Sequence, residues 1–151
     1  MSQTKRLTWN EYFLQIAEVV AQRATCPRAK CGCVLVDPKS NFILSTGYNG
    51  APPGEPHCIE DGCIMVDNHC QRAIHAEINA IAHAARHGIP IAGAEAYIFG
   101  ERADGNIKDV CRECQKVLNA TNIHVNSIRS SKVNGHTAFK PKESPHENEE
   151  V

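Results

Sequence analysis

Two short motifs, each at the start of a predicted helix, place the strongest constraint on how this chain can fold. His75-Ala76-Glu77 opens one helix, and Cys111 and Cys114 lie three residues apart in the first turn of another. Two thiolates on one face of a helical turn can bind a single metal ion, and an imidazole can supply a third ligand. If these side chains share one ion, both helix starts must meet.

The ligands predicted from these motifs are those of a catalytic zinc ion. Zinc favours nitrogen and sulfur ligands in tetrahedral geometry, and three protein ligands (His75, Cys111 and Cys114) leave a fourth position for water. The positive end of the helix would stabilise both thiolates. Glu77 follows His75 by two residues, and at a helix N-terminus both side chains can converge beyond the helix end. We therefore predict that Glu77 contacts the metal-bound water as general acid and base.

Each part of this pattern has a simpler explanation when taken alone. A C-x-x-C pair could be a redox pair, or it could form a structural zinc site without catalysis. A single histidine at a helix start is usually a surface cap. The combination of H-x-E, a later C-x-x-C and an intervening strand is more specific than either motif, and it favours a catalytic site.

Hydrophobic periodicity predicts one α/β domain over residues 1–129. Thr8 and Glu11 form a capping box, and an amphipathic helix continues to about Arg23. Apolar runs predict strands, and helical spacing predicts two more helices, the second capped by Asp109. The strands are expected at 33–36, 42–44, 94–99 and 123–125, and the helices at 74–85 and 111–119. Strands separated by helices should pair in parallel, next to one antiparallel hairpin at the start.

Two segments lack any periodic pattern. Residues 47–70 contain four glycines, three prolines and three cysteines, which predicts a long irregular loop. Residues 130–151 are polar and end in an acidic run, which predicts a flexible C-terminal tail.

The chain has eight cysteines among its 151 residues. We expect a reduced, cytoplasmic protein, because we find no signal segment and no run of 18 apolar residues. Four cysteines fall outside the predicted elements, in segments with too few large apolar side chains to order themselves, and a second, structural zinc would supply that order. These are Cys26, Cys58, Cys63 and Cys70. The alternative is that these thiols are simply buried, and the neighbouring His57 and His69 leave the ligand set open.

The formal net charge of −1 leaves no large basic excess to hold a nucleic-acid backbone, but it is compatible with a small anionic substrate. No membrane or nucleic-acid partner is therefore expected.

These motifs resemble those of the zinc-dependent cytidine and deoxycytidylate deaminases, whose signature is H-x-E followed by P-C-x-x-C. Within that family the chain is most similar to the deoxycytidylate and competence-operon deaminases. The matching stretches are residues 25–28, 47–54 and 74–81, and the resemblance covers about 9–125. Two departures are that Val110 replaces the proline before the first thiolate, and that residues 100–110 form a longer stretch. Both departures affect the shape of the pocket wall that residues 100–110 are expected to build.

The resemblance implies a three-layer fold, with a central mixed sheet flanked by helices, and hydrolytic deamination of dCMP to dUMP for thymidylate synthesis. Glu77 would move protons from the zinc-activated water to N3 and then to the exocyclic nitrogen, so that ammonia leaves. The alternatives are a deaminase of free cytidine, deoxycytidine, dCTP or tRNA adenosine, and a non-enzymatic zinc module. Such a module would have no use for Glu77.

The resemblance also suggests residues that bind nucleotides. Arg28 would contact the substrate 5′-phosphate and Asn49 a sugar hydroxyl. The alternatives are a solvated arginine at a turn and a turn-forming asparagine before glycine. Tyr48, Gly50 and Arg86 would lie at a regulatory site for dCTP or dTTP with Mg²⁺, at a subunit boundary of a homohexamer. Arg86 could instead satisfy the helix dipole.

Overall fold

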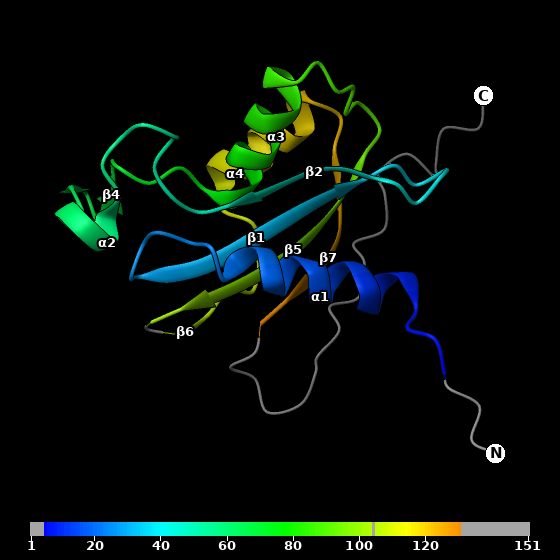
Figure 1. Ribbon diagram of the computed structural model, residues 1–151, viewed down its shortest axis with the longest axis horizontal. Coiled ribbons are helices and arrows are strands. Elements are labelled where there is room, and N and C mark those ends of the chain that lie inside the picture. Colours follow the sequence, from blue (N-terminus) through cyan, green and yellow to red (C-terminus); the bar gives the residue numbers. More distant parts are fainter. Residues whose placement is uncertain (1–4, 104, 131–151) are drawn as a thin grey trace.

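The computed structural model describes residues 5–103 and 105–130, which form a sheet covered by helices on both faces (Figure 1). The predicted tail lies outside these residues, apart from residue 130. In chain order the elements are α1 (Trp9–Ala21), β1 (Ala29–Val36), β2 (Ile43–Tyr48), α2 (Cys58–Asp61), β3 (Met65–Val66), β4 (His69–Cys70), α3 (Ala76–Arg86), β5 (Glu95–Arg102), β6 (Gly105–Asn106), α4 (Arg112–Ala120) and β7 (His124–Arg129).

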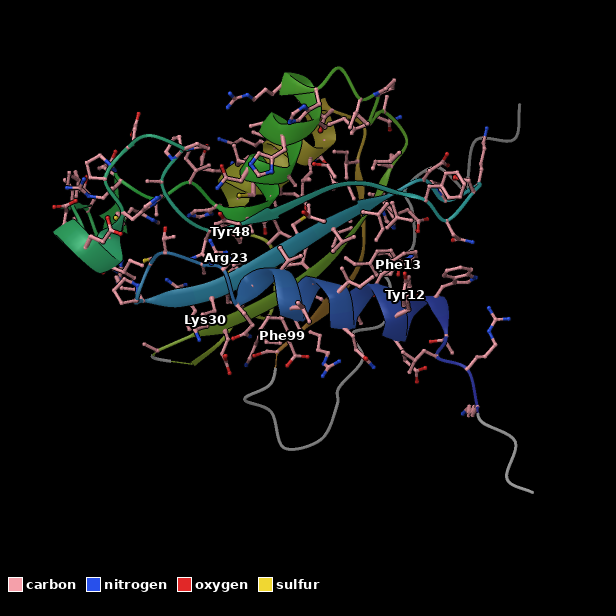
Figure 2. The ribbon with its side chains drawn as sticks, in the orientation of Figure 1. Tyr12, Phe13, Arg23, Lys30, Tyr48 and Phe99 are labelled. Atoms are coloured by element: carbon pink, nitrogen blue, oxygen red, sulfur yellow. The ribbon has the colours of Figure 1, made fainter. Side chains whose placement is uncertain are left out.

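Helix α1 covers one face of the sheet. Its predicted capping box is confirmed: Thr8 Oγ1 accepts from the Glu11 N–H at 3.2 Å, and the Glu11 carboxylate accepts from the Thr8 N–H at 2.8 Å. The buried side of the helix packs Phe13 and Ala17 against the sheet, where Phe99 of β5 is also fully enclosed. Figure 2 labels Phe13 and Phe99 on this side of the sheet. Burial of this apolar face holds α1 in place.

Helices α3 and α4 cover the opposite face, so the predicted three-layer α/β fold is confirmed (Figure 1). Ala76 and Ala80 of α3 and Leu118 of α4 pack against a cluster that includes Leu35 and Ile98 of the sheet. Helix α3 also approaches β2 very closely, because Gly47 has no side chain at the contact. Because α3 and α4 pack on the same face of the sheet, their N-termini can lie close together, as the two motifs require.

The strand pairing differs from the prediction in one respect. Strand β5 lies beside β1 and is antiparallel to it, whereas β5 and β7 pair in parallel as expected. The helical crossover through α3 does connect parallel strands, since β2 and β5 are both antiparallel to β1. The prediction was wrong because β1 is inserted between the two strands that the crossover joins.

Two local predictions are also corrected. The segment from Gly47 to Cys70 is not wholly irregular, because it completes β2 and then forms α2 and the small hairpin β3–β4. The N-cap of α4 is Cys111 rather than Asp109, whose carboxylate accepts from the adjacent Val110 N–H at 2.8 Å. Among the described residues, no helix is both long and apolar enough to cross a membrane.

Candidate active site

The structure brings His75, Cys111 and Cys114 together at the adjoining N-termini of α3 and α4. His75 is the N-cap of α3, and Cys111 is the N-cap of α4. The His75 Nδ1 atom lies 3.3 Å from each of the two sulfur atoms. The three possible ligand atoms all lie within 4.8 Å of one another. The predicted convergence of the two motifs is therefore what the fold produces.

These three side chains fit a tetrahedral zinc ion. With bonds of about 2.3 Å to sulfur and 2.0–2.1 Å to nitrogen, tetrahedral angles place nitrogen and sulfur ligands about 3.6 Å apart. The nitrogen–sulfur distances of 3.3 Å are close to that value. The donor set is one imidazole and two thiols, which zinc prefers. His75 and Cys111 are exposed whereas Cys114 is buried, so the ion would lie at the floor of an open pocket.

Glu77 lies in the same pocket, in the first turn of α3. Its side chain is only 8% exposed, and it is close enough to Cys114 for hydrogen bonding between the carboxyl and thiol groups. Burial raises the pKa of the Cys114 thiol, and the negative charge of Glu77 raises it further. Because a bound cation would relieve this repulsion, the arrangement favours a metal ion beside the carboxylate.

The pocket has a volume of about 180 Å³ and opens between the two motifs and the β3–β4 hairpin. His75, Glu77 and Cys111 form one side of it. Arg28 and Asn49, both predicted to contact substrate, also line this pocket. The structure thus joins the predicted substrate-binding residues to the predicted metal site.

Asn49 has a structural role within that wall. Its side-chain oxygen accepts from the Cys31 N–H at 2.8 Å, and its amide donates to the Ala29 carbonyl at 2.9 Å. These bonds attach the end of β2 to β1. An amide has two donor hydrogens and two acceptor lone pairs, so Asn49 keeps one of each for a ligand.

None of the residues predicted for a regulatory site lines the pocket. Tyr48 and Gly50 flank Asn49, and Arg86 is the exposed last residue of α3. The loop containing Tyr48 and Gly50 is bound to α3 by Asn79. The Asn79 amide donates to the Tyr48 carbonyl at 2.8 Å and lies 3.3 Å from the Gly50 carbonyl.

Several residues of the pocket were not predicted from the sequence. Asn68, His69 and Arg102 line it, and so does the thiol of Cys31, whose pKa is raised to about 12 by burial and by the nearby Glu77. Asn68 and His69 belong to a hairpin whose two-residue strands are too short to show a period. Asn79 was also missed, although an asparagine among alanines and isoleucines on the buried side of a helix is a usable signal.

Three of the four cysteines predicted to bind a second metal ion lie together. The thiols of Cys26, Cys58 and Cys63 lie within 4.8 Å of one another. The sulfur atoms of Cys58 and Cys70 are 3.5 Å apart. All eight cysteines are free thiols.

The chain thus combines a sheet covered by helices on both faces with one histidine and two cysteines beside a buried glutamate. These features are typical of zinc-binding proteins in which the fourth ligand position of the metal is open. A sequence profile described as "Cytidine and deoxycytidylate deaminase zinc-binding region" matches residues 7–128. The chain belongs to the cytidine and deoxycytidylate deaminase family.

Individual relatives agree with this assignment. ComE operon protein 2 of Bacillus subtilis is 44% identical over 94 residues, which are 62% of this chain and 49% of that protein. This chain therefore spans about half the length of that relative. Deoxycytidylate deaminase of Mycobacterium phage D29 is 33% identical over 129 residues, which cover 78% of this chain and 91% of the phage enzyme.

A solved structure has the same fold. The dCMP deaminase of cyanophage S-TIM5, crystallised in complex with dCMP and dUMP, superposes with a TM-score of 0.65 and 25% identity. The match covers 84% of this chain and 85% of the cyanophage chain.

Proposed function

We propose that this protein is a zinc-dependent deaminase that converts dCMP and water to dUMP and ammonia. The observation that carries the proposal is the buried Glu77 carboxyl beside three converging zinc ligands in one open pocket. A purely structural zinc site has no use for such a carboxylate. The names of the phage relatives support dCMP as the substrate.

The chemistry assigned to the chain's own residues is proton transfer. A zinc ion bound by His75, Cys111 and Cys114 would supply Lewis-acid activation of a water molecule. Glu77 takes one proton of the water and delivers it to N3 of the cytosine ring, while the water oxygen forms a bond to C4. Glu77 then moves the second proton of the water to the exocyclic nitrogen, the bond between C4 and that nitrogen breaks, and ammonia leaves. Glu77 is suited to this because α3 holds its carboxyl at the pocket floor.

Arg28 and Asn49 are the proposed substrate contacts. The Arg28 guanidinium lines the pocket, where it can pair with a 5′-phosphate. Asn49 retains one donor and one acceptor for a sugar hydroxyl. Arg28→Ala should raise the KM for dCMP about tenfold, the usual scale of a lost charged hydrogen bond, and leave deoxycytidine turnover unchanged.

The proposal is tested by measuring ammonia release from dCMP, deoxycytidine and dCTP in parallel. We expect the highest kcat/KM with dCMP. Glu77→Gln should retain zinc and fold but lose at least ~10²-fold in kcat. Near wild-type deamination by this variant would refute the mechanism, and a preference for deoxycytidine or dCTP would refute the substrate assignment.

Regulation and assembly follow as further parts of this proposal. We place a dCTP or dTTP effector with Mg²⁺ at the loop of Tyr48 and Gly50, because Asn79 connects this loop to the helix that carries Glu77. Arg86 would contact the effector from a neighbouring subunit. Exposed Trp9, Tyr12 and Val19 on α1 support assembly into a homohexamer. Light scattering with and without dTTP tests the assembly, and a monomer in both conditions would refute it. A cytoplasmic location stays a prediction.

A further inference from the structure

An arginine that no motif predicted lies in the wall of the catalytic pocket. Arg102 is the last residue of β5, in the stretch 100–110 where the chain departs from the family pattern. It lines the pocket together with Arg28. The two residues are neighbours in the sheet: Arg102 pairs with Ala29, the first residue of β1, and the Arg28 carbonyl accepts from the Ala103 N–H at 3.0 Å. Two cationic side chains therefore start from adjacent points at one end of the pocket.

The fold directs Arg102 to the side of the sheet that carries the candidate metal site. Side chains alternate between the two faces of a strand, so Arg102 shares a face with Gly100 and Ile98. Ile98 packs in the apolar cluster beneath α3 and α4. Arg102 also pairs on one side with β1 and on the other side with Gly105 of β6. The point from which its guanidinium group extends is thus fixed by strands on both sides.

The charged groups of the pocket are separated by sign. The carboxyl groups that line it are those of Glu77 and Asp109, and each belongs to a residue two positions away from a candidate zinc ligand. The two guanidinium groups come instead from the place where β1 begins and β5 ends. Cys31 lies within the electrostatic reach of both ends. Burial raises the pKa of its thiol, the negative charge of Glu77 raises that pKa further, and the positive charge of Arg102 acts in the opposite direction.

The order of these groups along the pocket matches the order of the groups in a nucleotide. Asn49, the proposed sugar contact, is hydrogen-bonded to Ala29 and to Cys31, so it lies alongside the part of β1 that separates the two charged ends. A nucleotide with the reacting carbon of its base beside Glu77 and its sugar beside Asn49 would have its 5′-phosphate at the end that carries the arginines.

The two arginines have the chemistry of an anion-binding pair. Arg28 Nη1 donates to the Met65 sulfur at 3.2 Å. A thioether is a weak and neutral acceptor, so this contact orients the guanidinium group without neutralising it. Each guanidinium group can donate two parallel hydrogen bonds to phosphate oxygens. Two positive charges at one end of a pocket repel one another, and a phosphate monoester with up to two negative charges relieves that repulsion.

We propose that Arg102 is a second phosphate-binding residue, which holds the 5′-phosphate of the substrate together with Arg28. This inference deepens the proposed function and rests on it. Arg102 would act on substrate affinity and selectivity and not on proton transfer, so only a substrate with a phosphate gains from it. The competing explanation is that Arg102 stabilises the turn between β5 and β6 and has no contact with the ligand.

The proposal is tested by isothermal titration calorimetry of the zinc-loaded full chain with dUMP and with deoxyuridine, which lacks the phosphate. Arg102→Ala should raise the Kd of dUMP about tenfold, the scale of one lost hydrogen bond to a charged group, and leave that of deoxyuridine within about twofold. Arg102→Lys should raise the Kd of dUMP only about threefold, because lysine keeps the charge but not the planar fork. Since Arg102 is exposed, neither substitution leaves a buried cavity. An unchanged Kd of dUMP in Arg102→Ala would overturn the proposal.

Lys30→Ala is the matched control, because it removes a positive charge from the same end of β1 on the opposite face of the sheet. Lys30 lies two residues before Gly32, whose Cβ atom would meet the Ala17 backbone of α1. Figure 2 labels Lys30 on the same side of the sheet as Phe99. The Kd of dUMP should stay within about twofold of the wild-type value, as is usual for a surface charge. A loss equal to that of Arg102→Ala would assign the effect to net charge and overturn the proposal.

Turnover separates this inference from the proposed function. For Arg102→Ala, kcat/KM should fall about tenfold with dCMP and change by less than about twofold with deoxycytidine. An equal loss with both substrates would assign a structural role to Arg102 and overturn the proposal. A wild-type protein that binds dUMP but releases no ammonia from dCMP would overturn the proposed function, and the titration with dUMP would still decide whether Arg102 binds the phosphate.

Discussion

Replacing Gly47 by alanine should damage the catalytic site without changing any residue in it. A Cβ atom at position 47 would lie 2.3 Å from the Ala80 nitrogen and 2.4 Å from the Ala76 oxygen, both in the backbone of α3. Since ordinary contacts begin at 3.4 Å, the helix must retreat by about 1 Å from β2. We expect the free energy of unfolding to fall by about 3 kcal/mol, the upper end for overpacking, because backbone cannot yield as a side chain can.

The same displacement should weaken metal binding and catalysis. His75 caps α3 and Glu77 lies in its first turn, so both move with the helix. Metal–ligand distances tolerate deviations of about 0.2 Å. A catalytic group misplaced by about 1 Å can lower the rate about 10²-fold. Gly47→Ala should therefore lose zinc from the catalytic site, and kcat/KM should fall about 10²-fold.

Gly32→Ala is the matched control on the other face of the sheet. Its Cβ would lie 2.0 Å from the Ala17 oxygen of α1, a helix that carries no residue of the site. Urea denaturation should show a midpoint about 1.5 M lower for both variants, taking a slope of about 2 kcal/mol per molar. Only Gly47→Ala should lose zinc and turnover. If it keeps both, or if Gly32→Ala loses them equally, the reasoning is refuted.

Three further variants test, by urea denaturation, how individual side chains stabilise the fold. Asn79→Ala removes the side-chain amide that donates to the Tyr48 carbonyl and should cost about 1–3 kcal/mol. An unchanged midpoint would contradict the role given to Asn79. Leu118→Ala removes a fully buried side chain of α4 and should cost about 2–5 kcal/mol. Thr8→Ala breaks the capping box of α1 and should cost about 1 kcal/mol with kcat unchanged. A lower kcat would contradict the expectation that α1 contributes no residue to the site.

Local patterns in the sequence were sufficient for the elements that form the core. The capping box at Thr8 and the helical spacing that follows it predict α1 almost to the residue, because side-chain and backbone groups three residues apart decide where a helix begins. The strands were located but predicted too short. Strand β1 begins at Ala29 rather than Cys33, since its first residues pair with β5, a partner that no local pattern reveals.

Each half of the candidate metal site was predictable for a similar reason. His75 and Glu77 lie within one turn, as do Cys111 and Cys114, so each half of the site is fixed by local geometry. That the two halves lie side by side could be inferred only from the preference of zinc for one set of nitrogen and sulfur ligands. The structure supplies the physical means, which is the packing of α3 and α4 on the same face of one sheet.

Tertiary structure alone decided the rest. The sequence could not show that β1 lies between β2 and β5, because strand order depends on which apolar faces pack together and not on spacing along the chain. The sequence offered Cys26, Cys58, Cys63 and Cys70 as candidates for a second metal site but could not show which of their thiols meet; the structure brings together those of Cys26, Cys58 and Cys63. Folding brings distant parts of the chain together here, because the turn before β1 and the β3–β4 hairpin border the same pocket.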